Sequence, residues 1–225
     1  MHKIYAFIFA KGKSTRLKNK NLRKIGNKSM VEHSILIAKK IKGISKIFVS
    51  SESNKILNLA KKNNVNCIKR PMKLCSPNSK EIYSWHHAIN YIENNNDKFD
   101  TFLSLPATAP LRSVYDVKKL IQNFKKNKSD ITITATKTNR FPFFNMIKVD
   151  KNGYVKIAAK KNNKKKLSKF YEITTVGYIS TPKYIKSTNN YFSGKVKFIE
   201  IPKARSIDID DKFDLDFARN LYKKK

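Results

Sequence analysis

The fold is decided by the stretch IYAFIFAKGKSTRLKNKN, residues 4–21. Its first six residues, Ile4 to Phe9, form an apolar run with the length and composition of a buried strand. The residues after it follow no helical period and gather lysines, an arginine, two hydroxyls and Gly12. Backbone N–H groups and cations converge in such loops, which is how α/β folds bind polyphosphates. We therefore expect an anion-binding loop here; the alternative is an ordinary basic surface loop.

The chain has 225 residues and a net charge of +33, from 49 lysines and arginines against 16 acidic residues. The lysines are spread over the whole chain, whereas a dedicated nucleic-acid binder gathers arginine and aromatic residues on one face. We expect one domain, residues 1–225, that binds nucleic acid only non-specifically through its charge. No apolar stretch approaches the roughly 20 residues of a membrane span. Met1 to Lys3 leave no room for a signal peptide before the first strand, so we expect a cytoplasmic protein without membrane contact.

Apolar patterns downstream alternate between strands and helices. Strands are expected at residues 46–50, 65–68, 101–105, 130–135 and 196–201, and helices at 30–42, 54–62, 80–93, 114–124 and from about 211 to 222. This alternation predicts an α/β, Rossmann-like fold with a mostly parallel central sheet. It stops between residues 137 and 180, where Asn152-Gly153 separates two apolar runs as in a β-hairpin. We interpret residues 137–180 as an inserted β-rich lobe with a lysine-rich tip at Lys160 to Lys166.

Two aspartates alternate with isoleucines in Ser206-Ile207-Asp208-Ile209-Asp210. Residues two apart in an extended chain share a face, with Cα atoms roughly 6–7 Å apart, so Asp208 and Asp210 point together. Paired carboxylates suit a hard cation such as Mg²⁺, which also binds substrate phosphates. The alternative is that the aspartates only cap the following helix. Because acidic residues are scarce in this chain, we expect the metal site.

A third segment, Leu105-Pro106-Ala107-Thr108-Ala109-Pro110-Leu111-Arg112, lies where an expected strand ends and a helix begins. This is the edge of an open α/β sheet at which ligands usually bind. On its own the segment is a loop stiffened by two prolines. Together with the other two segments, it is expected to form one wall of a pocket.

Taken in order, these segments resemble the acylneuraminate cytidylyltransferase family, which makes CMP-activated nonulosonic acids such as CMP-sialic acid. The family pattern A-R-x-G-S-K-R-L-x-x-K-N is similar to AKGKSTRLKNKN at residues 10–21. Arg70-Pro71 follows the third strand, the proline loop resembles P-T-S-P-L-R, and S-I-D-I-D is intact. The insert resembles the family's dimerisation lobe at residues 143–146 and 171–178. The resemblance implies the nucleotide-diphospho-sugar transferase fold and a homodimer.

The same resemblance implies a reaction and a set of site residues. The anomeric hydroxyl of a nonulosonic acid would attack the α-phosphorus of CTP, releasing pyrophosphate and leaving a CMP-sugar. The implied catalytic residues are Lys11, Arg16 and Lys20 on the triphosphate, with Asp208 and Asp210 holding Mg²⁺. The implied nucleotide-binding residues are Ala10, Lys11, Gly12, Ser14, Arg16, Lys20, Asn21, Arg70 and Ser79, and the candidate sugar contacts are Thr108, Arg140 and Thr174.

Four departures from the family pattern qualify this expectation. Lys11 stands where the family has arginine, Lys13 where it has glycine, and Pro106 where the sialic-acid enzymes have glutamine. Residues 174–176, Thr-Thr-Val, replace an N-G-A segment. The last two changes fall where the sugar is recognised. The resemblance therefore predicts cytidylyl transfer and leaves the sugar acid open.

Two alternatives remain at this point. A sugar-1-phosphate or Kdo-type nucleotidyltransferase has a similar glycine-containing loop, but it predicts acidic metal ligands after the central strand, where Leu103 to Leu111 has none. A basic nucleic-acid-binding protein would account for the net charge. It would leave the pair Asp208 and Asp210 unexplained.

Overall fold

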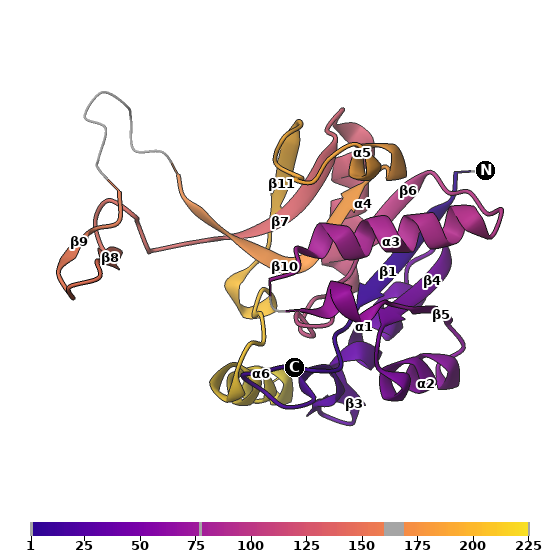
Figure 1. Cartoon of the computed structure of the whole chain (residues 1–225), viewed down its shortest axis with the longest axis horizontal. Coiled ribbons are helices and arrows are strands. Elements are labelled where there is room, and N and C mark those ends of the chain that lie inside the picture. The colour runs from indigo at the N-terminus through magenta and orange to yellow at the C-terminus, as the bar shows by residue number, and fades with distance from the viewer. Residues whose placement is uncertain (1, 77, 160–168, 225) are drawn as a thin grey trace.

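The predicted first strand is β1 (Ile4–Phe9), and it lies inside a seven-stranded sheet with all six side chains buried. The computed structural model describes residues 2–76, 78–159 and 169–224. The strand order is β11-β7-β10-β6-β1-β4-β5 (Figure 1). The other strands are β4 (Ile44–Ser51), β5 (Asn66–Lys69), β6 (Thr101–Ser104), β7 (Ile131–Lys137), β10 (Tyr171–Ser180) and β11 (Val196–Glu200). Only β10 runs antiparallel to its neighbours, so the prediction of a mostly parallel sheet is confirmed.

Helices cover both faces of the sheet because alternate residues of β1 point to opposite sides. Ile4, Ala6 and Ile8 belong to the core formed with α1 (Met30–Lys39), α2 (Asn54–Lys62) and α4 (Val114–Lys126). Tyr5, Phe7 and Phe9 belong to the core formed with α3 (Glu81–Asn94) and α5 (Pro182–Lys186). The predicted alternation is therefore confirmed, with α1 ending three residues early. No helix in the described part of the chain is long and apolar enough to cross a membrane.

A third, smaller core lies under the last helix, α6 (Lys212–Lys223). Its buried members come from segments far apart in the sequence: Leu17, Ile25, Met30, Leu111, Ile209, Leu215 and Ala218. Two short elements follow the loop after β1: the 3₁₀ turn η1 (Lys20–Leu22) and the hairpin of β2 (Lys24–Ile25) and β3 (Lys28–Ser29). Ile25 of this hairpin belongs to the core. Because it joins the loop after β1, the proline loop and the segment of Asp208 and Asp210, this core positions all three predicted site segments.

The inserted lobe projects from one side of the domain (Figure 1). It contains the predicted hairpin, formed by β8 (Ile147–Val149) and β9 (Val155–Ile157), with Gly153 at φ 85° in its turn. The boundary predicted at residue 180 is too wide, because β10 pairs with β6 and β7 inside the main sheet. The projecting part begins after β7 and ends before Tyr171. The lysine tract Lys160 to Lys166 lies outside the described residues.

Candidate active site

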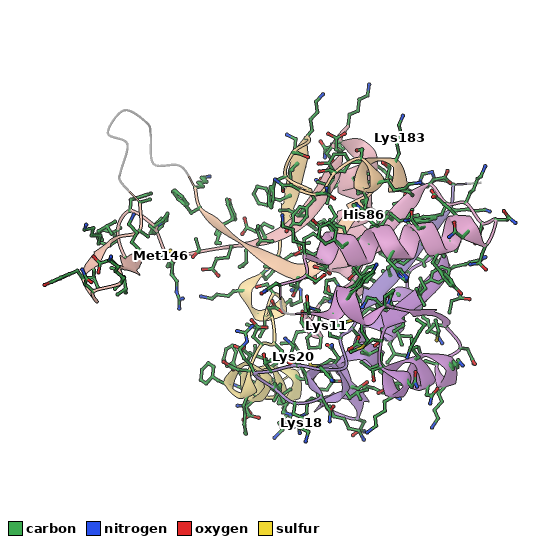
Figure 2. All side chains as sticks on the ribbon, viewed as in Figure 1. Lys11, Lys18, Lys20, His86, Met146 and Lys183 are labelled. Carbon is green, nitrogen blue, oxygen red and sulfur yellow. The ribbon has the colours of Figure 1, made fainter. Side chains whose placement is uncertain are left out.

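The loops after β1 and β6 meet at the carboxyl end of the sheet. From β1 the chain crosses through α1 to β4 on one side, and from β5 it returns through α3 to β6 on the other. Such a reversal of winding opens a crevice for ligands. A cavity of about 310 Å³ lies there, and its lining includes Lys11, Lys13, Ser14, Arg16, Lys20, Asn21, Glu81, Pro106, Thr108 and Thr175. Figure 2 shows Lys11 and Lys20 in the body of the protein, between α3 and α6.

Asp210 is joined to the loop after β1 by two ion pairs. Its Oδ2 lies 2.8 Å from Arg16 Nη2, and its Oδ1 lies 2.9 Å from Lys20 Nζ. Although partial burial acts in the opposite direction, Lys20 and Arg16 hold the pKa of the Asp210 carboxyl below its ordinary value. The capping alternative applies to the neighbouring Asp211, whose side chain accepts a hydrogen bond from the backbone N–H of Asp214 at the start of α6. The carboxylate of Asp210 is left to face the cations.

Asp208 lies against the proline loop. The backbone N–H of Ile209 donates to the carbonyl of Thr108 at 2.9 Å, and the Thr108 hydroxyl donates to Thr175 Oγ1 at 3.2 Å. Asp208 is exposed to solvent, and the hydroxyls of Thr108 and Thr175 form hydrogen bonds with its carboxyl group. Asp208 takes part in no ion pair with another described residue. Ile209, which lies between the two aspartates in the sequence, is buried in the core.

Some of the predicted nucleotide-binding residues line the other side of the cavity, and others lie behind it. Lys11 Nζ donates to the carbonyl of Ser76 at 3.0 Å, and Asn21 Nδ2 donates to the carbonyl of Lys11 at 2.8 Å. Ala10 is buried and its N–H donates to the carbonyl of Ser50. Arg70 is also buried, and its guanidinium faces Ser84 and a carboxylate after β4. The loop, η1 and the end of β5 therefore come together here.

Of the predicted site residues, only Lys11, Ser14, Arg16, Lys20, Asn21 and Thr108 line the cavity itself. Thr174 is buried and its hydroxyl donates to Thr134 Oγ1 at 2.8 Å, because neighbouring residues of a strand face opposite sides. Its neighbour Thr175 lines the cavity instead. Arg140 is exposed at the base of the lobe, and Ser79 lies in the loop before α3, where its N–H donates to the carbonyl of Ser76.

Sequence reasoning missed two charged residues at the site. Glu81, the first residue of α3, is exposed to solvent and lines the cavity. Arg112 lies behind the proline loop and donates to the carbonyls of Pro106 and Thr175 and to Ser34 Oγ. Burial lowers the pKa of Arg112 to about 9, although Asp208 and Asp116 act in the opposite direction. Arg112 ends the segment that resembles P-T-S-P-L-R, which is the signal that could have found it, whereas Glu81 has no such signal.

A larger groove of about 1080 Å³ lies at the other end of the sheet, between residues 93–100 and 181–187. Its charged residues are of both signs and include Glu93, Asp97, Asp100, Lys98 and Lys186. Several already pair with one another or with the body of the protein, as Lys186 does with Glu93 at 2.6 Å. The cavity at the carboxyl end, with its excess of lysines and arginine, is the better candidate for an anionic substrate.

Known proteins resemble this chain over nearly its whole length. The sequence profile of a family described as cytidylyltransferase matches residues 5–169. The post-translational flagellin modification protein B of Campylobacter coli is 31% identical, over 100% of this chain and 97% of that protein. A CMP-N,N'-diacetyllegionaminic acid synthase of Campylobacter jejuni is 29% identical, over 98% of this chain and 95% of that protein.

A solved structure shares the arrangement of the sheet and helices. It is a CMP:2-keto-3-deoxy-manno-octonic acid synthetase in complex with CTP, with a TM-score of 0.74 over 99% of each chain. Only 14% of the aligned residues are identical, so the likeness concerns the fold alone. It agrees with the α/β fold and the mostly parallel sheet described above.

Proposed function

The chain belongs to the cytidylyltransferase family, and from that membership we propose that it couples CTP to the anomeric hydroxyl of a nonulosonic, sialic-acid-like sugar acid. The products would be a CMP-sugar and pyrophosphate. The observation that supports this most directly is that Arg16 and Lys20 line the cavity and that Asp210 forms ion pairs with both of them. The cytoplasm, where CTP is made, is the compartment that the proposal requires.

The triphosphate would be bound by the cations that line the cavity: Lys11, Lys13, Arg16 and Lys20. Arg16 and Lys20 now pair with Asp210, and the Arg16 side chain is 65% exposed. An exposed pair is worth little, because each ion keeps much of its hydration. Arg16 can therefore move from Asp210 to a phosphate at small cost and stabilise the charge that develops on the leaving pyrophosphate.

Asp208 and Asp210 would hold Mg²⁺. Carboxylate oxygens are the ligands that Mg²⁺ prefers, and no cation among the described residues lies within ion-pair distance of Asp208. No cluster of three or more His, Cys, Asp or Glu side chains in the described parts of the chain could hold a metal, so phosphate oxygens and water would complete the shell. Bound Mg²⁺ would neutralise phosphate charge and lower the pKa of the attacking hydroxyl.

The sugar acid would lie beside the proline loop. Thr108 and Thr175 offer hydroxyls to the cavity, and Glu81 offers a carboxyl group. The relative from Campylobacter jejuni is named for legionaminic acid, which makes that nine-carbon acid the first candidate. Thr174 and Arg140 no longer belong to this proposal, because the structure places both away from the cavity.

The lobe would form the contact in a homodimer. Its hairpin exposes four apolar side chains on one face: Ile147 at 59%, Val149 at 62%, Val155 at 59% and Ile157 at 47%. An isolated two-stranded hairpin is marginally stable in water at best, and such surface normally lies against a partner. Figure 2 shows Met146 on this lobe, far from the body of the same chain. A second copy of the chain would cover it.

Release of pyrophosphate tests the proposed reaction. The enzyme is mixed with CTP, Mg²⁺ and in turn legionaminate, pseudaminate, N-acetylneuraminate or Kdo. We expect turnover with one of the nine-carbon acids and loss of about 1,000-fold in Asp210→Asn. Asp216→Asn, which removes an exposed carboxylate of α6, is the matched control and should keep full activity. Turnover with none of the acids, together with tight and salt-sensitive RNA binding, would overturn the proposal.

Light scattering tests the homodimer. We expect the wild-type chain at twice its 26.1 kDa mass. Val149→Asp in the hairpin should shift it to the monomer, whereas Phe217→Asp, which charges an exposed site on α6, should not. A monomeric wild-type chain contradicts this part of the proposal.

A further inference from the structure

Glu52 lies directly after β4, and its carboxylate is buried behind the cavity with 6% of the side chain exposed. Its Oε1 accepts hydrogen bonds from the backbone N–H groups of Gly12 at 2.6 Å and Lys13 at 3.3 Å. Its Oε2 lies 3.2 Å from Arg70 Nη2, and the Cys75 thiol donates to it at 3.2 Å. One carboxylate therefore contacts three separate segments of the candidate nucleotide site.

We propose that Glu52 is a positioning residue for CTP, which fixes the loop that carries the phosphate-binding cations to Arg70. This inference rests on the proposed function. Lys11, Lys13, Arg16 and Lys20 line the cavity from one segment, and Arg70 follows β5. No backbone ladder joins these two segments, since β1 and β5 lie on opposite sides of β4. The Glu52 carboxylate joins them from inside the protein, and at the surface Lys11 Nζ donates to the carbonyl of Ser76.

The Glu52 carboxylate is ionised at neutral pH. Burial alone would raise its pKa, but the Cys75 thiol, the N–H of Gly12 and the Arg70 guanidinium contribute to holding that pKa below its ordinary value. Charge-assisted hydrogen bonds of this kind are shorter and about twice as strong as neutral ones. The link between the loop and Arg70 is therefore electrostatic as well as steric.

Gly12 allows the loop to come this close. A Cβ atom at Gly12 would lie 2.5 Å from Ser53 Cβ and 3.2 Å from Glu52 Oε1, distances that require the loop to move away. The N–H groups of Gly12 and Lys13 donate to Glu52, so they are not offered to a phosphate. Triphosphate binding then depends on side-chain cations, whose positions follow from how Glu52 holds the loop.

Asp116 provides a matched control. It is a buried carboxylate with 2% of its side chain exposed, and it pairs with Arg205 at 2.9 Å. It also completes the capping box of α4 with Ser113. Like Glu52, Asp116 is a buried carboxylate that pairs with an arginine and accepts from a backbone N–H group. Its partners Arg205 and Ser113 do not line the cavity. A defect that Glu52 variants show and Asp116 variants do not is therefore specific to the nucleotide site.

Calorimetric titration of CTP with Mg²⁺, without sugar acid, tests the inference. We expect Glu52→Gln to weaken CTP binding about 10- to 100-fold, the scale on which small misplacements act. Asp116→Asn should bind CTP within twofold of the wild type although it unfolds at a lower temperature. In turnover assays Glu52→Gln should raise the KM for CTP and leave kcat at saturating CTP within twofold.

A second variant keeps the test decisive where Glu52→Gln does not fold. Glu52→Asp keeps the charge but is one methylene shorter, so it cannot reach both Gly12 and Arg70 and should weaken CTP binding to a smaller degree. Wild-type affinity in the folded Glu52 variants, or an equal loss in Asp116→Asn, overturns the inference. Failure of the wild-type protein to bind CTP would instead overturn the proposed function.

Discussion

Two arginines, Arg70 and Arg112, are equally buried on opposite sides of the cavity, each with 3% of its surface exposed. Arg70 faces a carboxylate, since its Nη2 lies 3.2 Å from Glu52 Oε2. Arg112 faces only the carbonyls of Pro106 and Thr175 and the hydroxyl of Ser34. Among the described residues, no carboxylate comes within ion-pair distance of Arg112.

The difference shows how the two sides of the site are built. The charge of Arg70 is neutralised by Glu52, so that side is a closed, packed ion pair. Arg112 has no carboxylate within ion-pair distance among the described residues. Burial lowers its pKa to about 9, and the charges of Asp208 and Asp116, which lie further away, act the other way. At neutral pH this unpaired charge makes the wall that carries Thr108 and Thr175 attractive to anions.

The largest effect is expected from removing the paired arginine. Arg70→Met leaves the Glu52 carboxylate buried without its cation, and breaking a buried ion pair in this way costs about 3–5 kcal/mol. We expect the free energy of unfolding, measured in urea, to fall by that amount. A loss below about 1 kcal/mol would show that Glu52 does not need Arg70.

A double variant sharpens the interpretation of that loss. If the cost comes from a stranded carboxylate, Arg70→Met combined with Glu52→Leu should be more stable than Arg70→Met alone, by about 2 kcal/mol. Urea unfolding of the four proteins in the cycle gives the coupling free energy directly. Additive losses would mean that the two residues act independently and that the comparison with Arg112 is unfounded.

The fold was predictable from the sequence because strand and helix periods are local properties. The apolar run at Ile4 to Phe9 and the helix at 54–62 match the observed β1 and α2 residue for residue. Asp208 and Asp210 could be placed at one site because alternation in an extended segment is also local. The partners of Asp210, Arg16 and Lys20, lie some 190 residues away, and their predicted role came from a resemblance rather than from spacing.

Other features of the site and the lobe could not be predicted, because they depend on contacts between distant residues that the spacing of apolar residues does not reveal. Thr174 was predicted to contact the sugar, but β10 shifts register against β7 between Thr174 and Tyr178, so the face of each residue could not be counted along the strand. In the sequence, Glu52 is only an acidic residue after a strand. Its proposed role in positioning the loop depends on its contacts with Gly12 and Arg70, which the sequence does not reveal. The lobe boundary failed because β10 runs from the lobe directly into the main sheet.

A smaller effect is expected from removing the unpaired arginine. Arg112→Met strands no carboxylate and removes a buried charge, so its cost is that of the lost hydrogen bonds to Pro106 and Thr175, about 1–3 kcal/mol. Urea unfolding of Arg112→Met beside Arg70→Met measures the contrast. An Arg112 variant that is destabilised as much as the Arg70 variant would remove the distinction between the two sites.

The smallest effect is a dependence on pH that only the paired arginine should show. The pKa of Glu52 lies below its ordinary value in the folded chain, so the stability that Glu52 contributes is fully present above the unfolded value of about 4.3 and is lost as the pH falls through the folded value. The difference in unfolding free energy between the wild type and Glu52→Gln should therefore be constant from pH 7 to 5 and shrink below about pH 4, by at most about 1.4 kcal/mol per pH unit. The difference between the wild type and Arg112→Met should change less over the same range, because no described carboxylate lies within ion-pair distance of Arg112 and Asp208 and Asp116 act on it only from further away. Two curves that fall in parallel would mean that these carboxylates support Arg112 as strongly as Glu52 supports Arg70.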